Sequence, residues 1–294
     1  SELTDTDGFE RAELLGAFEE ATYKQSIIDA ISRPAERVMT WATYQDIFLT
    51  KARVEQGIAF EQQHRDSFDR AEAEWGVDRW VMLAILGVET SYGRNKGRYR
   101  VIDALSTLAF DYPPRSGFFR KELRELFLLA REQQKPVTGL LGSYAGAMGY
   151  GQFIPSSYRA YAVDFNDDAF IDIWNEPVDA IASIANYLAV HGWQKNGPIL
   201  VPMTSKAALP IDFFNQQLKP ALSAEKLTEA GIALNESLLD WPALKAAPLR
   251  YEGKAGVETW LGFQNFYSIA RYNRSRLYAM AVFQLSQRLK AAAS

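Results

Sequence analysis

A run of nine residues without a charge constrains this chain more than any other feature, because such a run is stable only when it is buried. The run covers residues 80–88 and ends at Glu89, and Gly93 follows four residues later. Its length and composition predict a buried helix, for which Gly93 is a natural terminator. Glu89 then lies in the last turn, where burial and the negative end of the helix dipole both favour a protonated carboxyl. Such a carboxyl suits a general acid that works near neutral pH, although a helix-end glutamate paired with Arg94 or another arginine is the alternative.

The scarcity of two residue types narrows the chemistry. The chain has no cysteine and only two histidines, His64 and His191. Without cysteine there are no disulfides, thiolate metal sites or cysteine nucleophiles. His64 lies in a charged helical stretch and His191 precedes a glycine at an expected helix end, so we expect surface or capping roles for both. The chemistry must therefore rest on carboxylates, tyrosines, amides and arginines.

The overall charge narrows the range of partners. The net charge is −4, the isoelectric point is near 5.4 and no polybasic block is present, so we expect neither nucleic acid nor anionic membrane as a general partner. The longest apolar runs are well short of the roughly 18–20 residues that a membrane span needs. The chain begins at Ser1 without a visible signal peptide, which we interpret as a mature or trimmed form of a longer precursor.

The spacing of apolar residues predicts a mainly helical chain of two or three sub-domains. Pro34 is expected to start or break one of the first helices. Between 197 and 260, prolines recur and helical periodicity weakens, and a short segment at 199–201 resembles a strand. We interpret this part as a small inserted α/β sub-domain. Helices are expected within 9–73, 75–93, 100–110, 117–134, 177–190 and 263–293.

Two further segments carry groups that suit a carbohydrate. Five glycines stand between 139 and 151, just before Gln152, and the segment 271–278 is rich in arginine, tyrosine and asparagine. Glycines allow backbone to approach a ligand closely, and hydroxyls, amides and ring faces suit sugar hydroxyls and apolar sugar faces. The alternative is that the tyrosines pack in the core and the glycines only form turns.

Three motifs in this order carry a resemblance to a known family. They are Gly87-Val88-Glu89-Thr90, Ala145-Gly146-Ala147-Met148-Gly149-Tyr150-Gly151-Gln152-Phe153 and Arg271-Tyr272-Asn273. Together they closely resemble the lytic murein transglycosylases of the B family, and the resemblance covers about residues 35–285. It implies a mainly α (α+β) fold with a goose-lysozyme-like helical core. It also implies cleavage of peptidoglycan between MurNAc and GlcNAc, which leaves a 1,6-anhydro ring on MurNAc.

The resemblance also implies which residues do the work. Glu89 matches the catalytic acid and base of the family. Arg115 matches one of a pair of arginines thought to meet the peptide or lactyl carboxylate, but Pro114 stands where the other would be, which puts the grip on the peptide stem in doubt. The remaining matches are substrate-binding positions: Tyr44, Ser143, Met148, Gln152, Tyr187, Tyr272, Asn273 and Tyr278.

A single carboxyl is enough for this reaction if the substrate supplies the rest. A conventional glycosidase needs two carboxylates, whereas here the MurNAc N-acetyl group would stabilise C1 and the C6 hydroxyl would close the ring. Intramolecular attack benefits from high effective molarity, so it can outcompete water. We expect that catalysis requires no cofactor. One rival is a hydrolytic muramidase, for which Asp111 is the nearest second carboxylate. The other is a peptidoglycan-binding protein without turnover.

The segment 164–172 resembles the start of an EF-hand calcium loop. Oxygen ligands fall at the expected spacing, but Ala169 replaces the usual glycine and Asn175 replaces the closing glutamate. Some family members bind Ca²⁺ in a lengthened loop closed by a later aspartate. We therefore consider a structural calcium ion here, with an acidic surface turn as the alternative. The candidate ligands are Asp164, Asn166, Asp168, the Phe170 carbonyl and Asp179.

These observations also predict an organisation and a setting. We expect an N-terminal helical sub-domain over 1–74 with part of 279–294, a lysozyme-like core over 75–197 and 261–278, and the α/β insert over 198–260. From the family's substrate, we expect the partner to be peptidoglycan strands that carry peptide stems. The resemblance further points to the periplasm, as a soluble or outer-membrane lipid-anchored monomer. It allows contacts with a penicillin-binding protein or other wall enzymes.

Overall fold

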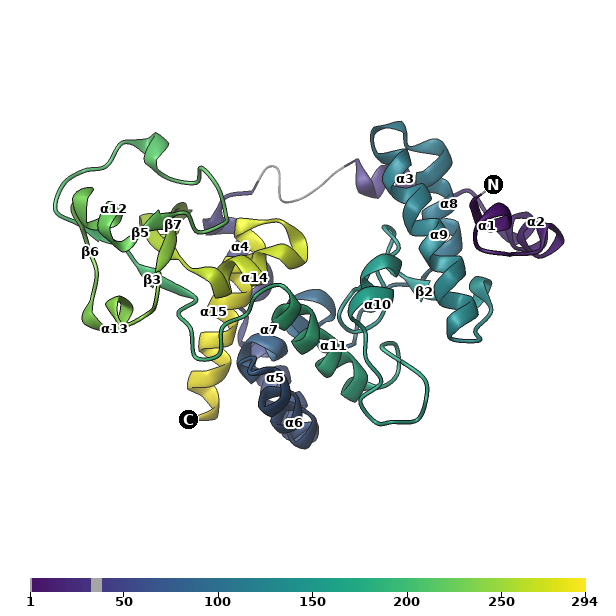
Figure 1. Cartoon of the computed structure of the whole chain (residues 1–294), viewed down its shortest axis with the longest axis horizontal. Helices are drawn as coiled ribbons and strands as arrows, with labels where there is room; N and C mark the ends of the chain where they lie inside the picture. The colour runs from purple at the N-terminus through teal and green to yellow at the C-terminus, as the bar shows by residue number, and fades with distance from the viewer. Residues whose placement is uncertain (1, 33–38) are drawn as a thin grey trace. The chain divides into compact units, whose positions relative to one another are not determined.

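The structure is a computed structural model that describes residues 2–32 and 39–294, so the expected helix break at Pro34 lies outside the described residues. It is mainly helical, as the sequence predicted, and it has small sheets (Figure 1), which are antiparallel. The chain divides into two compact units, Ser1–Pro34 with Glu89–Ile184 and Ala35–Val88 with Ala185–Ser294. The three-part division drawn from the sequence stays a prediction. Among the described residues, every helix is too short or too polar to cross a membrane.

The first unit is built around two long helices. The apolar residues of α8 recur at three- and four-residue spacing, and Ile102, Leu105 and Leu108 are fully buried. α8 packs along α9, where Leu126 and Leu129 are also fully buried. The elements of this unit are α1 (Glu2–Asp5), α2 (Arg11–Glu20), α3 (Gln25–Ile31), β1 (Tyr99–Arg100), α8 (Val101–Asp111), η2 (Pro113–Arg115), α9 (Ser116–Glu132), η3 (Val137–Gly139), β2 (Leu141–Gly142) and α10 (Pro155–Tyr161).

Two helices pass from one unit to the other. The uncharged run forms most of α7 (Arg79–Thr90), and its residues 81–88 are all buried, as predicted. α11 (Pro177–Val190) begins at a proline, which suits the first turn of a helix because a backbone N–H there would find no acceptor within the helix. The carboxyl ends of these helices therefore belong to different units: Glu89 to the first and Tyr187 to the second.

The helices of the second unit pack around its long C-terminal helix. α15 contacts both α4 and α5. Beside α5, Arg79 of α7 binds the buried Glu61 at 3.4 Å and Glu72 at 2.7 Å. The helices are α4 (Trp41–Phe48), α5 (Lys51–Gln63), α6 (Arg65–Trp75), α14 (Gln264–Asn273) and α15 (Arg276–Ala293).

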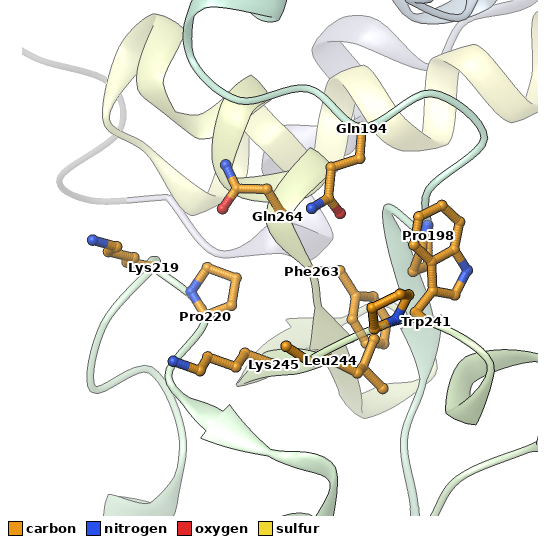
Figure 2. A pocket seen from close by; sticks show the side chains of 11 residues that line it. Gln194, Pro198, Lys219, Pro220, Trp241, Leu244, Lys245, Phe263 and Gln264 are labelled. Atoms are coloured by element: carbon orange, nitrogen blue, oxygen red, sulfur yellow. The ribbon is translucent and has the colours of Figure 1, made fainter.

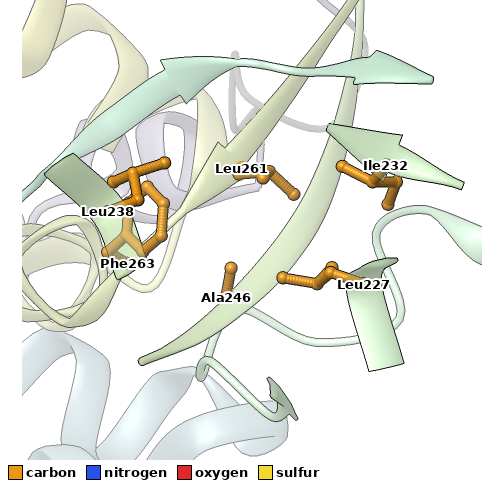
Figure 3. Packing of buried hydrophobic residues seen from close by; sticks show 6 residues of the cluster. All are labelled: Leu227, Ile232, Leu238, Ala246, Leu261 and Phe263. Carbon is orange, nitrogen blue, oxygen red and sulfur yellow. The ribbon is translucent and has the colours of Figure 1, made fainter. Parts of the chain in front are cut away.

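Between α11 and α14 the second unit forms the small α/β part that the sequence predicted. Its main sheet is antiparallel, with strand order β3-β8-β7-β5, and β4 pairs with β6. Six apolar side chains form its core in Figure 3: Leu227, Ile232, Leu238, Ala246, Leu261 and Phe263. The elements are β3 (Leu200–Pro202), β4 (Thr204–Ser205), η4 (Ile211–Phe213), β5 (Leu222–Ser223), α12 (Ala224–Glu229), β6 (Ile232–Ala233), α13 (Glu236–Leu239), β7 (Lys245–Gly253) and β8 (Gly256–Gly262).

Candidate active site

Glu89 lies half-buried in the last turn of α7, and the residue after it is fixed on two sides. The Thr90 side chain is 1% exposed. Its Oγ1 donates to the carbonyl of Tyr150 at 3.0 Å and accepts from the backbone N–H of Gly93 at 2.9 Å. Because both partners are backbone groups, Thr90 joins the end of the helix to the glycine-rich loop. Thr90 belongs to the motif Gly87-Val88-Glu89-Thr90, but the sequence alone does not indicate this role for it.

The chain leaves the helix through a sharp turn. Ser91, Tyr92 and Gly93 have φ values of 50°, 59° and 85°, all in the left-handed region. A Cβ at Gly93 would lie 2.0 Å from the ring of Tyr150, so only glycine permits this approach. The predicted terminator is therefore also the place where the end of the helix meets Tyr150. We name Glu89–Gly93 together with Gly142–Phe153 the Glu89 region.

The loop of the Glu89 region is held by backbone hydrogen bonds. Met148 bridges to both Gly142 and Phe153, and the Ser143 backbone N–H donates to the Ala147 carbonyl at 2.7 Å. The half-buried Ser143 Oγ accepts from the N–H groups of Ala145 and Ala147, at 3.2 and 3.1 Å. Its own hydroxyl proton therefore stays available for an acceptor on a ligand. Met148 is 0% exposed, so the sugar contact predicted for it would require the loop to move.

Gln152 is positioned by the same loop. Its φ is 51°, and its side-chain N–H groups donate to the carbonyls of Gly149 at 2.9 Å and Lys96 at 3.2 Å. Its Oε1 is then the part of the amide that remains to accept from a ligand. A Cβ at Gly149 would lie 2.4 Å from the Ile173 carbonyl oxygen, which itself accepts from the Tyr150 N–H at 2.9 Å. The conformation of this loop thus requires glycine at position 149, because any side chain there would collide with the backbone.

Three other carboxylates of the first unit are buried among the described residues, and each has hydrogen-bond donors around it. Asp103 pairs with Arg100 at 2.8 Å. Glu122 accepts from the Oγ and N–H of Ser156, at 2.7 and 3.0 Å. Burial raises the pKa of Glu122 and also of Asp179, but Asp179 accepts two backbone N–H groups, at 2.9 and 2.8 Å. These three carboxylates have structural tasks.

The second unit brings three of the predicted tyrosines together. Tyr187 stacks on His191 with ring centroids 4.0 Å apart and meets the edge of Tyr272 at 4.7 Å. Tyr272 in turn lies parallel to Tyr278, at 6.2 Å. The Tyr187 hydroxyl donates to the Arg271 carbonyl at 2.9 Å, which fixes α11 to α14. We name Tyr187, His191, Tyr272 and Tyr278 the tyrosine cluster.

The sequence predicts a surface or capping role for His191, and it does not indicate that His191 lies in the tyrosine cluster. Its Nδ1 lies 2.7 Å from the Tyr187 carbonyl oxygen. Burial lowers the pKa of His191, which favours the neutral ring that stacks on Tyr187. The signal in the sequence was the four-residue spacing from Tyr187, which puts both side chains on one face of a helix.

The remaining predicted binding residues are Tyr44, Asn273 and Arg115. Tyr44 is 4% exposed and its ring contacts Phe48 at 5.2 Å. Asn273 is exposed at the end of α14. Arg115 is exposed in the first unit, and its guanidinium lies 4.3 Å from the ring centre of Phe118. Arg115 is thereby held open to solvent beside an aromatic face.

The acidic loop folds onto itself. Asp164 accepts from the N–H groups of Asp168 and Ala169, at 3.3 and 2.8 Å. Asn166 donates to Glu176 at 2.6 Å, a residue that the sequence did not single out. Burial raises the pKa of Glu176, and the charges of Asp168 and Asp179 raise it further. Within the described ranges, no three His, Cys, Asp or Glu side chains are already grouped as a metal site.

The chain is similar to several known proteins. A family model described as a transglycosylase SLT domain matches residues 1–287. The chain is 39% identical to the membrane-bound lytic murein transglycosylase B of Escherichia coli (strain K12) over 295 residues, which covers 97% of this chain and 80% of the relative. It is also similar to the crystal structure of the soluble lytic transglycosylase SltB1 from Pseudomonas aeruginosa. There the TM-score is 0.93 at 48% identity, and the match covers 99% of this chain and 97% of that one.

Two further solved structures hold bound groups. One is the lytic transglycosylase Slt35 of Escherichia coli in complex with calcium, with a TM-score of 0.88, 39% identity and coverage of 99% of this chain and 91% of that one. The other is SltB3 from Pseudomonas aeruginosa in complex with NAG-NAM-pentapeptide. Its TM-score is 0.83 at 30% identity, and the match covers 97% of this chain and 76% of that one.

Proposed function

Because this chain belongs to the transglycosylase SLT domain family, we propose that Glu89 is the single acid, and then the base, of its reaction. The chain is a lytic transglycosylase that acts on the peptidoglycan of the cell wall. The observation that carries the assignment of Glu89 is local. Glu89 is half-buried and directly follows the uncharged run of α7, next to Thr90, whose hydroxyl makes two hydrogen bonds. The other buried carboxylates of its unit are bound to structural donors.

The reaction that we propose needs no water. Protonated Glu89 donates its proton to the glycosidic oxygen as the bond from that oxygen to C1 of MurNAc breaks. The N-acetyl group of MurNAc stabilises C1 on the opposite face. The C6 hydroxyl oxygen then bonds to C1, and its proton returns to the Glu89 carboxylate. The products are a free GlcNAc hydroxyl and a 1,6-anhydro MurNAc end, and Glu89 is protonated again.

The residues of each unit that match the family's binding positions would bind and orient the substrate. Ser143 can donate its hydroxyl proton and Gln152 can accept at Oε1, which suits the two ends of an acetamido group. The exposed Asn273 and the half-buried Tyr272 offer an amide and a ring face. Tyr44, Tyr187 and Tyr278 are buried, so we propose that they shape the saccharide site through the residues they contact. Arg115 would meet a carboxylate of the peptide stem.

The acidic loop fits a calcium ion in part. When bound, Ca²⁺ would supply structural cross-linking through oxygen ligands. Asp164, Asn166, Asp168 and the Phe170 carbonyl would hold it, with Asp179 as the predicted closing ligand. Glu176 is a further candidate, since its carboxylate accepts from Asn166 at 2.6 Å and a cation would offset the repulsion from Asp168 and Asp179. Added calcium should raise the melting temperature, and Asp168→Asn should remove the rise whereas the exposed Asp167→Asn should not. Equal rises in both variants would contradict this site.

We also propose a setting for the enzyme. Its relative in Escherichia coli is named as membrane-bound, and the substrate lies in the bacterial wall. A periplasmic protein, soluble or anchored by a lipid, fits both facts. Fractionation of cells that express the full-length protein tests this: recovery in the cytoplasm would contradict it. A monomeric state and contacts with penicillin-binding proteins or other wall enzymes stay predictions.

Two substitutions test the role of Glu89. Glu89→Gln keeps the shape of the side chain and removes the proton, so turnover of purified sacculi should fall by a factor of about 10³ or more while saccharide binding is largely retained. Asp111→Asn is the matched control, because Asp111 is the carboxylate that a muramidase would need and is exposed at the end of α8. It should leave turnover near that of the unchanged protein. Near-normal activity of Glu89→Gln would refute the assignment.

A further inference from the structure

A pocket of about 220 Å³ lies in the second unit, beside the small sheet. Four separate segments line it: the connection after α11, the loop before β5, the turn before β7 and the start of α14. In Figure 2, Lys219 and Lys245 stand on one side and Trp241 and Pro198 on the other, with Phe263 between them. The catalytic assignment of Glu89 makes no use of any residue in this pocket.

Buried hydrogen bonds hold the rim of the pocket in place. Asn265 is 0% exposed, and it clamps the backbone of Gln194 on both sides. The Gln194 N–H donates to Asn265 Oδ1 at 2.7 Å, and Asn265 Nδ2 donates to the Gln194 carbonyl at 2.8 Å. Gln264 donates from Nε2 to the His191 carbonyl and to Ser268 Oγ, both at 3.3 Å. The Gln264 Oε1 is therefore held at the rim as an acceptor for a ligand, and the fixed backbone of Gln194 carries a second side-chain amide to the pocket.

The charge at the pocket is one-sided. Lys219 and Lys245 are both exposed, and neither forms an ion pair with any carboxylate in the described part of the chain. No aspartate or glutamate is among the described residues that line the pocket. The pairing of β5 with β7 brings the segments of the two lysines together. Lys245 lies opposite Ser223 in this pairing, and Ser223 follows Lys219 by four residues. Two ammonium groups without a counter-charge attract an anion.

The opposite wall is apolar. Trp241 is half-buried in the turn before β7, and its indole N–H has no hydrogen-bond partner in residues 2–32 and 39–294. Phe263, 1% exposed, forms part of both the pocket lining and the core of the α/β part (Figure 3). A ring face, an indole donor and two amides suit small apolar side chains and peptide groups. A neutral glycan would make no use of the lysines.

We propose that this pocket binds a carboxylate-bearing peptide stem of the cell wall. The ammonium groups would bind the carboxylates, the Trp241 side would cover small apolar side chains, and the two glutamines would hydrogen-bond to peptide groups. This inference rests on the proposed function, since stems reach the enzyme only on its glycan substrate. A site for stems in the second unit would hold a strand by its peptides as well as by its sugars.

Calorimetric titration of the full chain with a free pentapeptide stem, without sugar, tests the proposal. The double substitution Lys219→Ala with Lys245→Ala should weaken binding roughly tenfold, because each exposed ion pair contributes less than about 1 kcal/mol. The matched control removes two exposed lysines of the same part, Lys206→Ala with Lys226→Ala, and should bind as the unchanged protein does. A pentapeptide with all carboxylates amidated should bind more weakly to the unchanged protein.

Two further measurements locate the binding and separate this inference from the enzymatic one. Replacing both pocket lysines by arginine should restore most of the affinity, and the peptide should shift the indole ¹⁵N–¹H signal that disappears in Trp241→Phe. Equal peptide affinity in the double alanine variant and in the unchanged protein would overturn the proposal. Cleavage of glycan strands by the unchanged protein is measured separately. If the protein binds the peptide but does not cleave glycan strands, the proposed function is refuted and the proposal for the pocket is not.

Discussion

The Glu89 region and the tyrosine cluster are both built from residues that the sequence singled out, but they are held by different forces. In the Glu89 region the contacts run through backbone atoms: Thr90 reaches the Tyr150 carbonyl, and Gly149 lies against the Ile173 carbonyl. In the tyrosine cluster they run through ring faces, with Tyr187 between His191 and Tyr272. Backbone contacts leave no room for adjustment, whereas ring contacts tolerate small shifts. Substitutions in the first region should therefore be severe and those in the second graded.

The largest effect is expected from Gly149→Ala. The added Cβ would meet the Ile173 oxygen at 2.4 Å, and φ is +68°. We expect unfolding free energy to fall by about 3 kcal/mol or more, as measured by urea denaturation. Gly8→Ala is the matched control, because Gly8 has φ of +69° and nothing within 4 Å of an added Cβ; it should lose only about 1 kcal/mol. Equal losses would show that the close approach at Gly149 does not matter.

Thr90→Val should come next. It keeps the shape of the side chain and removes the hydrogen bonds to the Gly93 N–H and the Tyr150 carbonyl. Loss of a buried hydroxyl that makes two hydrogen bonds should lower the free energy of unfolding by about 2 kcal/mol. It should also lower kcat, because the end of α7 beside Glu89 is no longer hydrogen-bonded to the loop. Thr90→Ser keeps the hydroxyl and should recover most of both. A Thr90→Val variant with unchanged kcat would separate Thr90 from the placement of Glu89.

Tyr187→Phe tests how far the tyrosine cluster depends on its ring contacts. It removes the hydrogen bond to the Arg271 carbonyl but keeps the stacked ring, so we expect a loss of about 1 kcal/mol. Thermal melts compare this variant with Tyr187→Ala, which also loses the ring contacts and should be several times worse. If the two variants were equally unstable, the cluster would depend on its hydroxyl and not on its ring faces.

Acid pH should produce the smallest effect. Burial lowers the pKa of His191, and the charge of Arg271 lowers it further. The folded value is thus below the unfolded one, so the contribution of neutral His191 to stability is present above about pH 6.5. It is lost as the pH falls through the lower, folded value. Unfolding free energy should decline over that range, and His191→Gln should reduce the decline. An unchanged pH profile in His191→Gln would contradict this account.

The sequence predicted local features well and distant contacts poorly. The uncharged run at 80–88 and the strand near 199–201 were found as α7 and β3, because periodicity and breakers are local properties. The bond from Thr90 to the Tyr150 carbonyl joins residues 60 positions apart, and no local pattern encodes it. The burial of Met148 depends likewise on its bridges to Gly142 and Phe153. Residue type could nominate these positions, but only the fold shows which of their atoms are free to meet a ligand.

The most direct test of the central claim is mass spectrometry of muropeptides released from purified sacculi in H₂¹⁸O, for the unchanged protein and for Glu89→Gln. If Glu89 first donates a proton and then takes one from the C6 hydroxyl, the products carry no ¹⁸O. They are lighter by one water than hydrolytic products, and Glu89→Gln releases almost none. Products with ¹⁸O at reducing MurNAc ends, or anhydro products from Glu89→Gln at near-normal rates, would contradict the single-glutamate reaction.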